Sequence, residues 1–191
     1  MATKLDNKAL STMIISVVED TFKQMCHVAP SAEPVAGEKD IIEYDGRMRL
    51  FPMEKFNAPA YVAIVNYYLS PKHLEAKDAV GTFILYFKED LVERLFKAFG
   101  RSASESENEQ ACLDVVGDLC QVIAENLKKQ ILALDLADLT LSAPYKYKNA
   151  VLEGAQFDYN LFKKQEVAFS FWKEKCVVVE ACMGHVPTKG R

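Results

Sequence analysis

Apolar residues recur with a helical period in two long segments of the chain, residues 8–27 and residues 107–134. The apolar stripe of the first consists of Leu10, Met13, Ile14, Val17, Val18, Phe22 and Met25. That of the second consists of Cys112, Val116, Leu119, Cys120, Val122, Ile123, Leu127 and Ile131. Residues 88–99 have the pattern of a shorter helix, with Gly100 placed to end it. We therefore predict two long amphipathic helices and one short helix.

Strand patterns fill much of the remaining chain. Residues 61–69 and 81–87 are apolar at odd and even positions alike, which is typical of strands buried on two faces. After residue 134 the period changes to two, and this predicts strands at 139–142, 145–152, 166–172 and 176–183. Asp45-Gly46 between two short β-prone runs predicts a hairpin within residues 41–51, after a break at Pro30, Pro34 and Gly37.

The order of these elements predicts the class of fold. No change in composition divides the 191 residues, so we expect a single α+β domain over residues 1–191. A multi-stranded, largely antiparallel sheet should be packed by the long N-terminal helix, the short helix and the second long helix. Residues 38–56 are expected to form a hairpin insertion, and residues 1–7 and 186–191 to be flexible tails.

Composition and charge exclude several classes of function. The net charge of -4 argues against nucleic-acid binding, which needs clustered lysine and arginine. The first residues lack the apolar core of a signal peptide, and no apolar run approaches the roughly 20 residues of a membrane span, so we expect a cytoplasmic protein without membrane insertion. Five cysteines without paired spacing indicate reduced thiols, and three scattered histidines predict no metal site. No phosphate-binding glycine loop is present, so no cofactor of its own is expected.

The candidate chemistry lies on the polar side of the second long helix. At about 100° per residue, one side carries Asp114, Asp118, Gln121, Glu125 and Lys129. A carboxylate and an amide three residues apart share a helix face. Alone, this pattern is more often that of an ordinary solvated surface than that of a functional site.

The context of this helix resembles the CheC/CheX/FliY family of chemotaxis phosphatases. The resemblance covers most of the chain and is closest over residues 61–142. The family motif is Asp or Ser, three residues, Glu, two residues and Asn, usually with Gly directly before the Glu. Here Asp114, Gly117, Asp118 and Gln121 take these places, so the acid is one methylene shorter and the amide one longer. The hairpin at residues 41–51 is not part of the family pattern.

The resemblance implies a function for each position. The partner is a phosphorylated CheY-like response regulator, which supplies the aspartyl phosphate and a divalent cation, expected to be Mg²⁺. Asp118 would pair with the regulator's active-site lysine, and Gln121 would hydrogen-bond the attacking water without acting as a base. Asp114, Gly117 and Glu125 would support the docking face. A glycine inside a helix costs about 1 kcal/mol relative to alanine, which indicates either tight packing at Gly117 or close approach of the partner.

Some family members carry a second motif on their first helix. The corresponding stretch here, residues 16–23, has Lys23 in the amide position, and lysine cannot accept a hydrogen bond from water. We therefore predict one functional face, as in the CheX branch, whose members form homodimers through their sheets. Two alternatives stay open: a response-regulator scaffold weakened by the changes at Asp118 and Gln121, and an α+β interaction domain of unrelated function.

Overall fold

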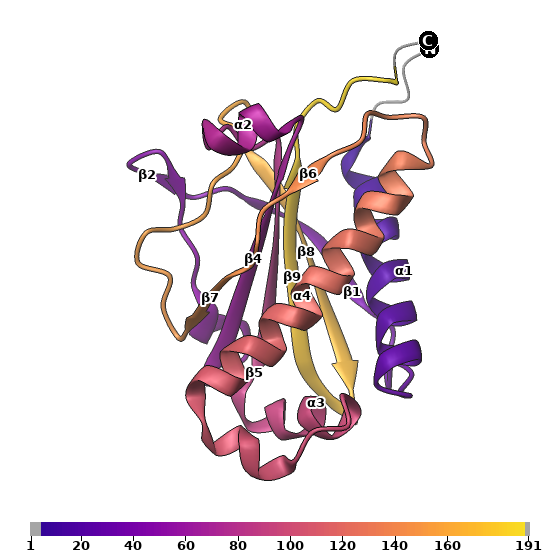
Figure 1. Ribbon diagram of the computed structural model, residues 1–191, viewed down its shortest axis with the longest axis vertical. Coiled ribbons are helices and arrows are strands. Elements are labelled where there is room, and N and C mark those ends of the chain that lie inside the picture. The colour runs from indigo at the N-terminus through magenta and orange to yellow at the C-terminus, as the bar shows by residue number, and fades with distance from the viewer. Residues whose placement is uncertain (1–4, 190–191) are drawn as a thin grey trace.

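The structure, a computed structural model, describes residues 5–189 and is built around a seven-stranded antiparallel sheet (Figure 1). The strand order is β1-β8-β9-β5-β4-β6, and β7 also pairs with β4. The strands are β1 (Val35–Asp40), β4 (Ala60–Tyr68), β5 (Gly81–Lys88), β6 (Thr140–Leu141), β7 (Tyr145–Lys148), β8 (Lys163–Phe171) and β9 (Glu174–Met183). This sheet with its helices confirms the predicted α+β class.

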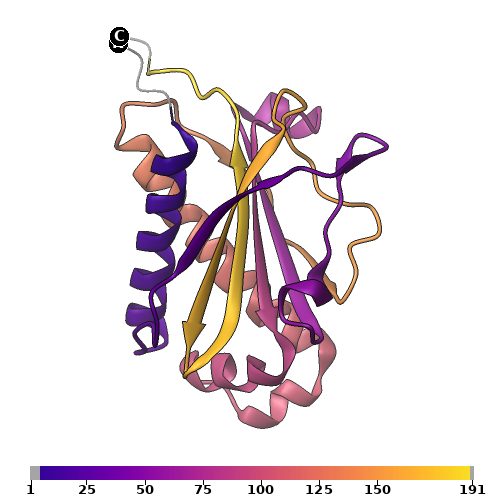
Figure 2. The ribbon, with the colours of Figure 1, turned by 180° about the vertical axis from the view of Figure 1, so that it is seen from behind.

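Two long helices cover one face of the sheet (Figures 1 and 2). They are α1 (Asn7–Met25) and α4 (Glu109–Leu132), and the short helix α3 (Val92–Ala98) packs at one end of α4. Their apolar sides form a single core with the facing residues of β4, β5, β8 and β9. The three predicted helices are therefore confirmed. No helix within residues 5–189 combines the length and the apolar character needed to cross a membrane.

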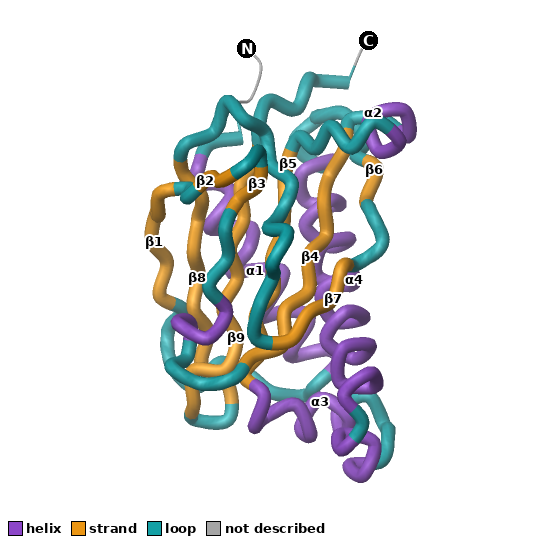
Figure 3. Tube along the Cα trace, turned by 90° about the vertical axis from the view of Figure 1, so that its left-hand side faces the viewer, coloured by secondary structure: helices purple, strands orange, loops and turns teal. Residues whose placement is uncertain are grey.

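The opposite face of the sheet is covered by loops and a small hairpin (Figure 3). The hairpin strands are β2 (Glu43–Tyr44) and β3 (Arg47–Met48), and the 3-10 helix η1 (Pro52–Lys55) follows them. Asp45 and Gly46 have φ values of 52° and 69°, as a two-residue type I′ turn requires. Residues 149–162 lie beside the hairpin, and backbone hydrogen bonds of 2.9 Å join Met48 and Ala155 in both directions. The hairpin and the loop of residues 149–162 bury a second apolar core against this face of the sheet. Strands β4 and β5 therefore have a core on each side, which explains why they are apolar on both faces.

Three expectations need correction. Residues 38–40, expected within the hairpin insertion, belong to the edge strand β1, which pairs with β8 where a break had been predicted at Gly37. Residues 186–189, expected in a flexible tail, are hydrogen-bonded: Ala137 N donates to Pro187 O at 2.7 Å and Lys189 N to Asp135 O at 2.9 Å. Residues 5–7 were also expected in a flexible tail, but Asn7 begins α1 and Asp6 caps this helix by accepting from Ala9 N at 2.7 Å. The rest of the predicted tails, residues 1–4 and 190–191, lies outside the described residues. The helix α2 (Pro71–Glu75) was not predicted.

Candidate functional site

Helix α4 is firmly attached to the sheet along one side. The Asn108 side chain accepts from Ala111 N at 3.1 Å and caps its first turn. In the middle of the helix, the buried Tyr67 hydroxyl donates to the carbonyl of Ala124 at 2.9 Å. Of the apolar side predicted from sequence, all residues but the half-buried Val122 are buried. The outward side of α4 is therefore a rigid platform (Figure 1).

Asp118 is the most available group on this platform. Its side chain is exposed and forms no hydrogen bond or ion pair with any residue in the part of the chain that the structure describes. It follows the buried Gly117 directly and precedes the buried Leu119, so the core fixes the helix on both sides of it. The carboxylate is free to meet a partner.

Gln121 lies one turn further along α4 and is half-buried. Its amide nitrogen donates to the carboxylate of Glu125 at 2.9 Å, while its amide oxygen is buried and has no hydrogen-bond partner within residues 5–189. The side chain thus lies along the helix, toward Glu125. To offer its amide beside Asp118 it must rotate, which costs one exposed hydrogen bond. Glu125, expected to support the docking face, is the acceptor of this hydrogen bond.

Asp114 is already engaged within the molecule. Its carboxylate accepts from Lys146 Nζ at 2.5 Å and from Gln110 Nε2 at 3.0 Å. These hydrogen bonds, that of Lys146 first, hold the pKa of the Asp114 carboxyl below its ordinary value. With 44% of its side chain exposed, Asp114 remains at the edge of the platform. Its charge is balanced by Lys146 rather than left for a partner.

The structure gives Gly117 a reason to be glycine. A Cβ at this position would lie 2.6 Å from Cδ of Lys146 and 3.6 Å from Cγ of Pro144. The stem of Lys146 therefore crosses the helix at Gly117 on its way to Asp114. Of the two explanations open from sequence, tight packing within the domain accounts for the glycine.

Lys146 is the functional-site residue that the sequence did not assign. Strand β7 alternates, so Lys146 and Lys148 face α4, and Lys148 Nζ pairs with Glu89 at 2.7 Å and with Glu109 at 3.1 Å. The side chains of these two lysines are only 31% and 26% exposed, so this face of β7 is not a solvated surface. The alternation of lysine and tyrosine over residues 145–148 was the available signal.

We predict that Gly117→Ala will displace Lys146 while changing the free energy of unfolding by less than about 1 kcal/mol. Alanine favours the helix by about 1 kcal/mol, and the half-exposed ion pair that is lost contributes about 0–1 kcal/mol. The pKa of Asp114, followed by NMR titration, should rise toward its ordinary value. Lys146→Ala is the matched control, because it removes the same ion pair and leaves Gly117 unchanged. A pKa for Asp114 that stays as low in Gly117→Ala as in the parent would show that Lys146 does not need this space.

The sequence matches no protein-family model and no curated protein. Solved structures do match. A CheC-like superfamily protein from Shewanella sp. PV-4 has a TM-score of 0.60 at 14% identity, over 92% of this chain and 97% of that one. A chain of the CheX–CheY–BeF₃–Mg²⁺ complex from Borrelia burgdorferi has a TM-score of 0.57 at 12% identity, over 95% and 99%. FliY from Thermotoga maritima has a TM-score of 0.54 at 13% identity, over 94% and 86%. The chain therefore has the fold of the CheC, CheX and FliY chemotaxis proteins, which confirms the predicted resemblance at the level of the fold.

Proposed function

We propose that this protein docks the outward side of α4 on a phosphorylated CheY-like response regulator and accelerates hydrolysis of its aspartyl phosphate. The observation that carries this proposal is the position of Asp118. It is an exposed, unpaired carboxylate, as far as residues 5–189 extend, on a helix that the core holds rigid. A fold shared with a chain from a CheX–CheY complex supports the choice of partner.

In the proposed reaction, water attacks the phosphorus of the aspartyl phosphate and the bond from phosphorus to the aspartyl oxygen breaks. Inorganic phosphate leaves and the regulator's carboxylate is restored. Asp118 pairs with a lysine of the regulator and fixes the approach of α4. Gln121 rotates away from Glu125 and holds the water in line by hydrogen bonds, a positioning role that an amide can fill without titrating. The divalent cation of the reaction belongs to the regulator.

A single functional face is part of this proposal. On α1, Ser16 occupies the first position of the second motif, and its hydroxyl accepts from Gln130 Nε2 of α4 at 3.2 Å. Its side chain therefore takes part in packing the two helices together. Lys23, in the amide position, is exposed and has no acceptor for a water proton.

One observation favours the alternative of a scaffold that binds without catalysis. The Gln121 amide is turned toward Glu125, and its oxygen is buried. If docking does not release that hydrogen bond, Asp118 still recognises the regulator but no group holds the water. The two functions differ only in turnover, so binding and turnover must be measured separately.

The test is a phosphate-release assay with CheY-like regulators of the source organism, phosphorylated with a small phosphodonor. The parent protein should accelerate release, and Gln121→Ala should lower that acceleration by about 100-fold because the water loses its positioning group. Binding of Gln121→Ala to the beryllofluoride form of the regulator should stay unchanged. Asp118→Ala should weaken this binding instead.

Lys129→Ala is the matched control for this assay. Lys129 is exposed on the same side of α4, one turn beyond Glu125, and its ammonium donates to Asn126 Oδ1 at 3.3 Å. It should leave binding and turnover unchanged. Binding by the parent without acceleration would establish the scaffold, and absence of binding to every regulator would reject both functions.

We further propose that the protein forms a homodimer through its sheet, as the CheX-like resemblance implies. Strand β1 is an edge strand whose six residues are all exposed. Sedimentation of the full chain measures this directly, and a monomer at micromolar concentration would reject it.

A further inference from the structure

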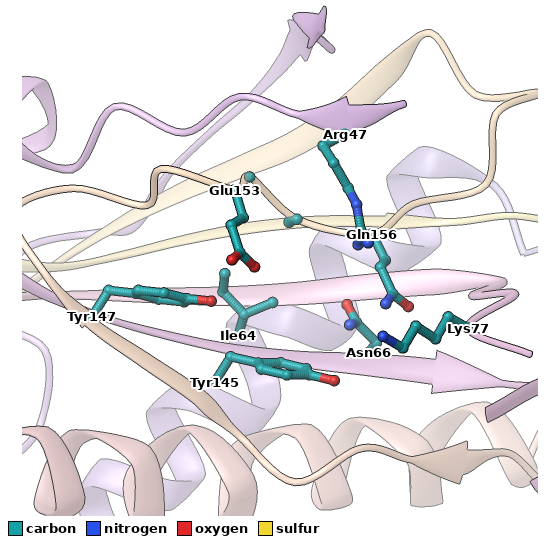
Figure 4. Close-up of a pocket in the computed structure, with 10 residues that line it drawn as sticks. Arg47, Ile64, Asn66, Lys77, Tyr145, Tyr147, Glu153 and Gln156 are labelled. Carbon is teal, nitrogen blue, oxygen red and sulfur yellow. The ribbon is translucent and has the colours of Figure 1, made fainter. Parts of the chain in front are cut away.

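A polar cavity of about 90 Å³ lies on the face of the sheet opposite α4 (Figure 4). Five segments build it: the hairpin strand β3, strands β4 and β7, the residue Lys77 after α2, and the loop of residues 149–162. Its walls are held by the Met48–Ala155 backbone pair and by Gly154, where a Cβ would meet the Met48 carbonyl at 2.5 Å. The lining that matters chemically consists of Arg47, Asn66, Lys77, Tyr145, Glu153 and Gln156.

Two amide side chains present their donors to this cavity. Asn66 is 2% exposed, and its oxygen accepts from Thr82 Oγ1 at 2.8 Å. The oxygen of Gln156 accepts from the Tyr68 hydroxyl at 2.6 Å. Since each oxygen already has a hydroxyl donor, each amide directs its NH₂ group to the remaining space. A donor-lined wall favours a ligand that carries only acceptors.

Two cations complete the same end of the cavity. Neither Arg47 nor Lys77 forms an ion pair with any of the described residues, although both are surrounded by polar groups. Figure 4 shows the Lys77 ammonium beside Asn66, the Arg47 side chain beside Gln156, and the Tyr145 hydroxyl close to them. Glu153, the carboxylate of the lining, lies at the other end near Tyr147. Positive charge and hydrogen-bond donors therefore converge away from the one acid.

We propose that this cavity binds a small oxyanion, of the size of phosphate or a short carboxylate, between Arg47 and Lys77. The planar guanidinium offers paired N–H donors to such a group. Asn66 Nδ2, Gln156 Nε2 and the Tyr145 hydroxyl supply further donors. The exposed Lys77 and Tyr145 form the entrance, and the nearly buried Asn66 forms the floor.

This site is separate from the proposed docking face. Along β7, Tyr145 and Tyr147 point into the cavity while Lys146 and Lys148 face α4 on the other side of the strand. A substitution in the cavity therefore leaves Asp118 and Gln121 in place. The two proposals can fail independently.

The test is isothermal titration of the full chain with inorganic phosphate and, in a second series, with acetate. Ionic strength is held constant so that general screening does not change between points. We expect saturable binding of one anion per chain. Arg47→Gln and Lys77→Gln should each weaken it by about 10-fold, the loss expected for a hydrogen bond to a charged group.

Arg49→Gln is the matched control. Arg49 lies two residues away in the same hairpin, but its guanidinium donates to Leu152 O at 2.7 Å and stacks over Tyr44, outside the cavity. It should bind the anion as the parent does. Whichever of phosphate and acetate binds more tightly identifies the class of ligand. If millimolar phosphate and acetate both fail to bind, or if Arg49→Gln loses as much affinity as Arg47→Gln, the proposal is overturned.

Discussion

Glu180→Ala is expected to lower the free energy of unfolding by about 3–5 kcal/mol, the loss typical of removing one partner from a buried charge network. Glu180 on β9 is 1% exposed. One of its oxygens accepts from Lys55 Nζ at 2.5 Å and from Lys164 Nζ at 2.8 Å, and the other accepts from the Tyr86 hydroxyl at 2.6 Å. Urea denaturation of parent and variant measures the difference.

The charge state of this network is fixed by its contacts. Burial disfavours ionisation of Glu180, but the ammonium groups of Lys164 and Lys55 outweigh it and hold its pKa below the ordinary value of 4.5. At neutral pH the carboxylate is therefore charged. Its removal leaves two ammonium groups, 7% and 14% exposed, close together without their shared counter-ion.

Glu166→Ala provides the matched control for Glu180→Ala. Glu166 also pairs with Lys55, at 2.5 Å, but its side chain is 24% exposed. When Glu166 is removed, Lys55 still has its ion pair with Glu180. The expected loss is about 1 kcal/mol, near the upper end of exposed ion pairs. Equal losses in both variants would mean that the network contributes little beyond one surface pair.

Elements with their own apolar periodicity could be predicted from the sequence. The stripes of α1 and α4 and the two-sided strands β4 and β5 are local patterns, and the structure places them as expected. Strand β1 has no such pattern, because all of its residues are exposed at the sheet edge. It exists through backbone pairing with β8, more than 120 residues away, as from Val35 to Ala168. Long-range pairing of this kind leaves no local signal.

The candidate site divides in the same way. The exposure of Asp118 follows from helix period alone, and the structure agrees. Two features of the site depend on Lys146: the ion pair of Asp114 and the tight space at Gly117. Lys146 is 32 positions from Asp114, and the pairing of β7 with β4 brings it to α4. The turn of Gln121 toward Glu125 is a choice of rotamer. The oxyanion cavity is assembled from five separate segments, so no short stretch of sequence indicates it.

The double substitution Asp118→Glu with Gln121→Asn is expected to raise phosphatase turnover by about 10- to 100-fold, because 1 Å of misplacement can cost about 100-fold in rate. These residues are those of the family motif that the sequence resembles. The longer acid extends its reach toward the regulator's lysine. The shorter asparagine side chain does not reach Glu125. Its amide is therefore free of the hydrogen bond of 2.9 Å that Gln121 forms with Glu125 in the parent.

The single variants are the controls, because the acid and the amide have separate roles: the acid pairs with the regulator's lysine and the amide positions the water. Asp118→Glu alone should tighten binding to the beryllofluoride form of the regulator, and Gln121→Asn alone should act mainly on turnover. Both positions lie on the outward side of α4, so unfolding free energies should stay within about 0.5 kcal/mol of the parent. If the parent binds the regulator without turnover and the double variant turns over, the parent is a scaffold that lacks activity only because of the lengths of these two side chains. Unchanged turnover with intact binding would contradict the role proposed for this pair, because neither reach nor release of the amide would then limit the reaction.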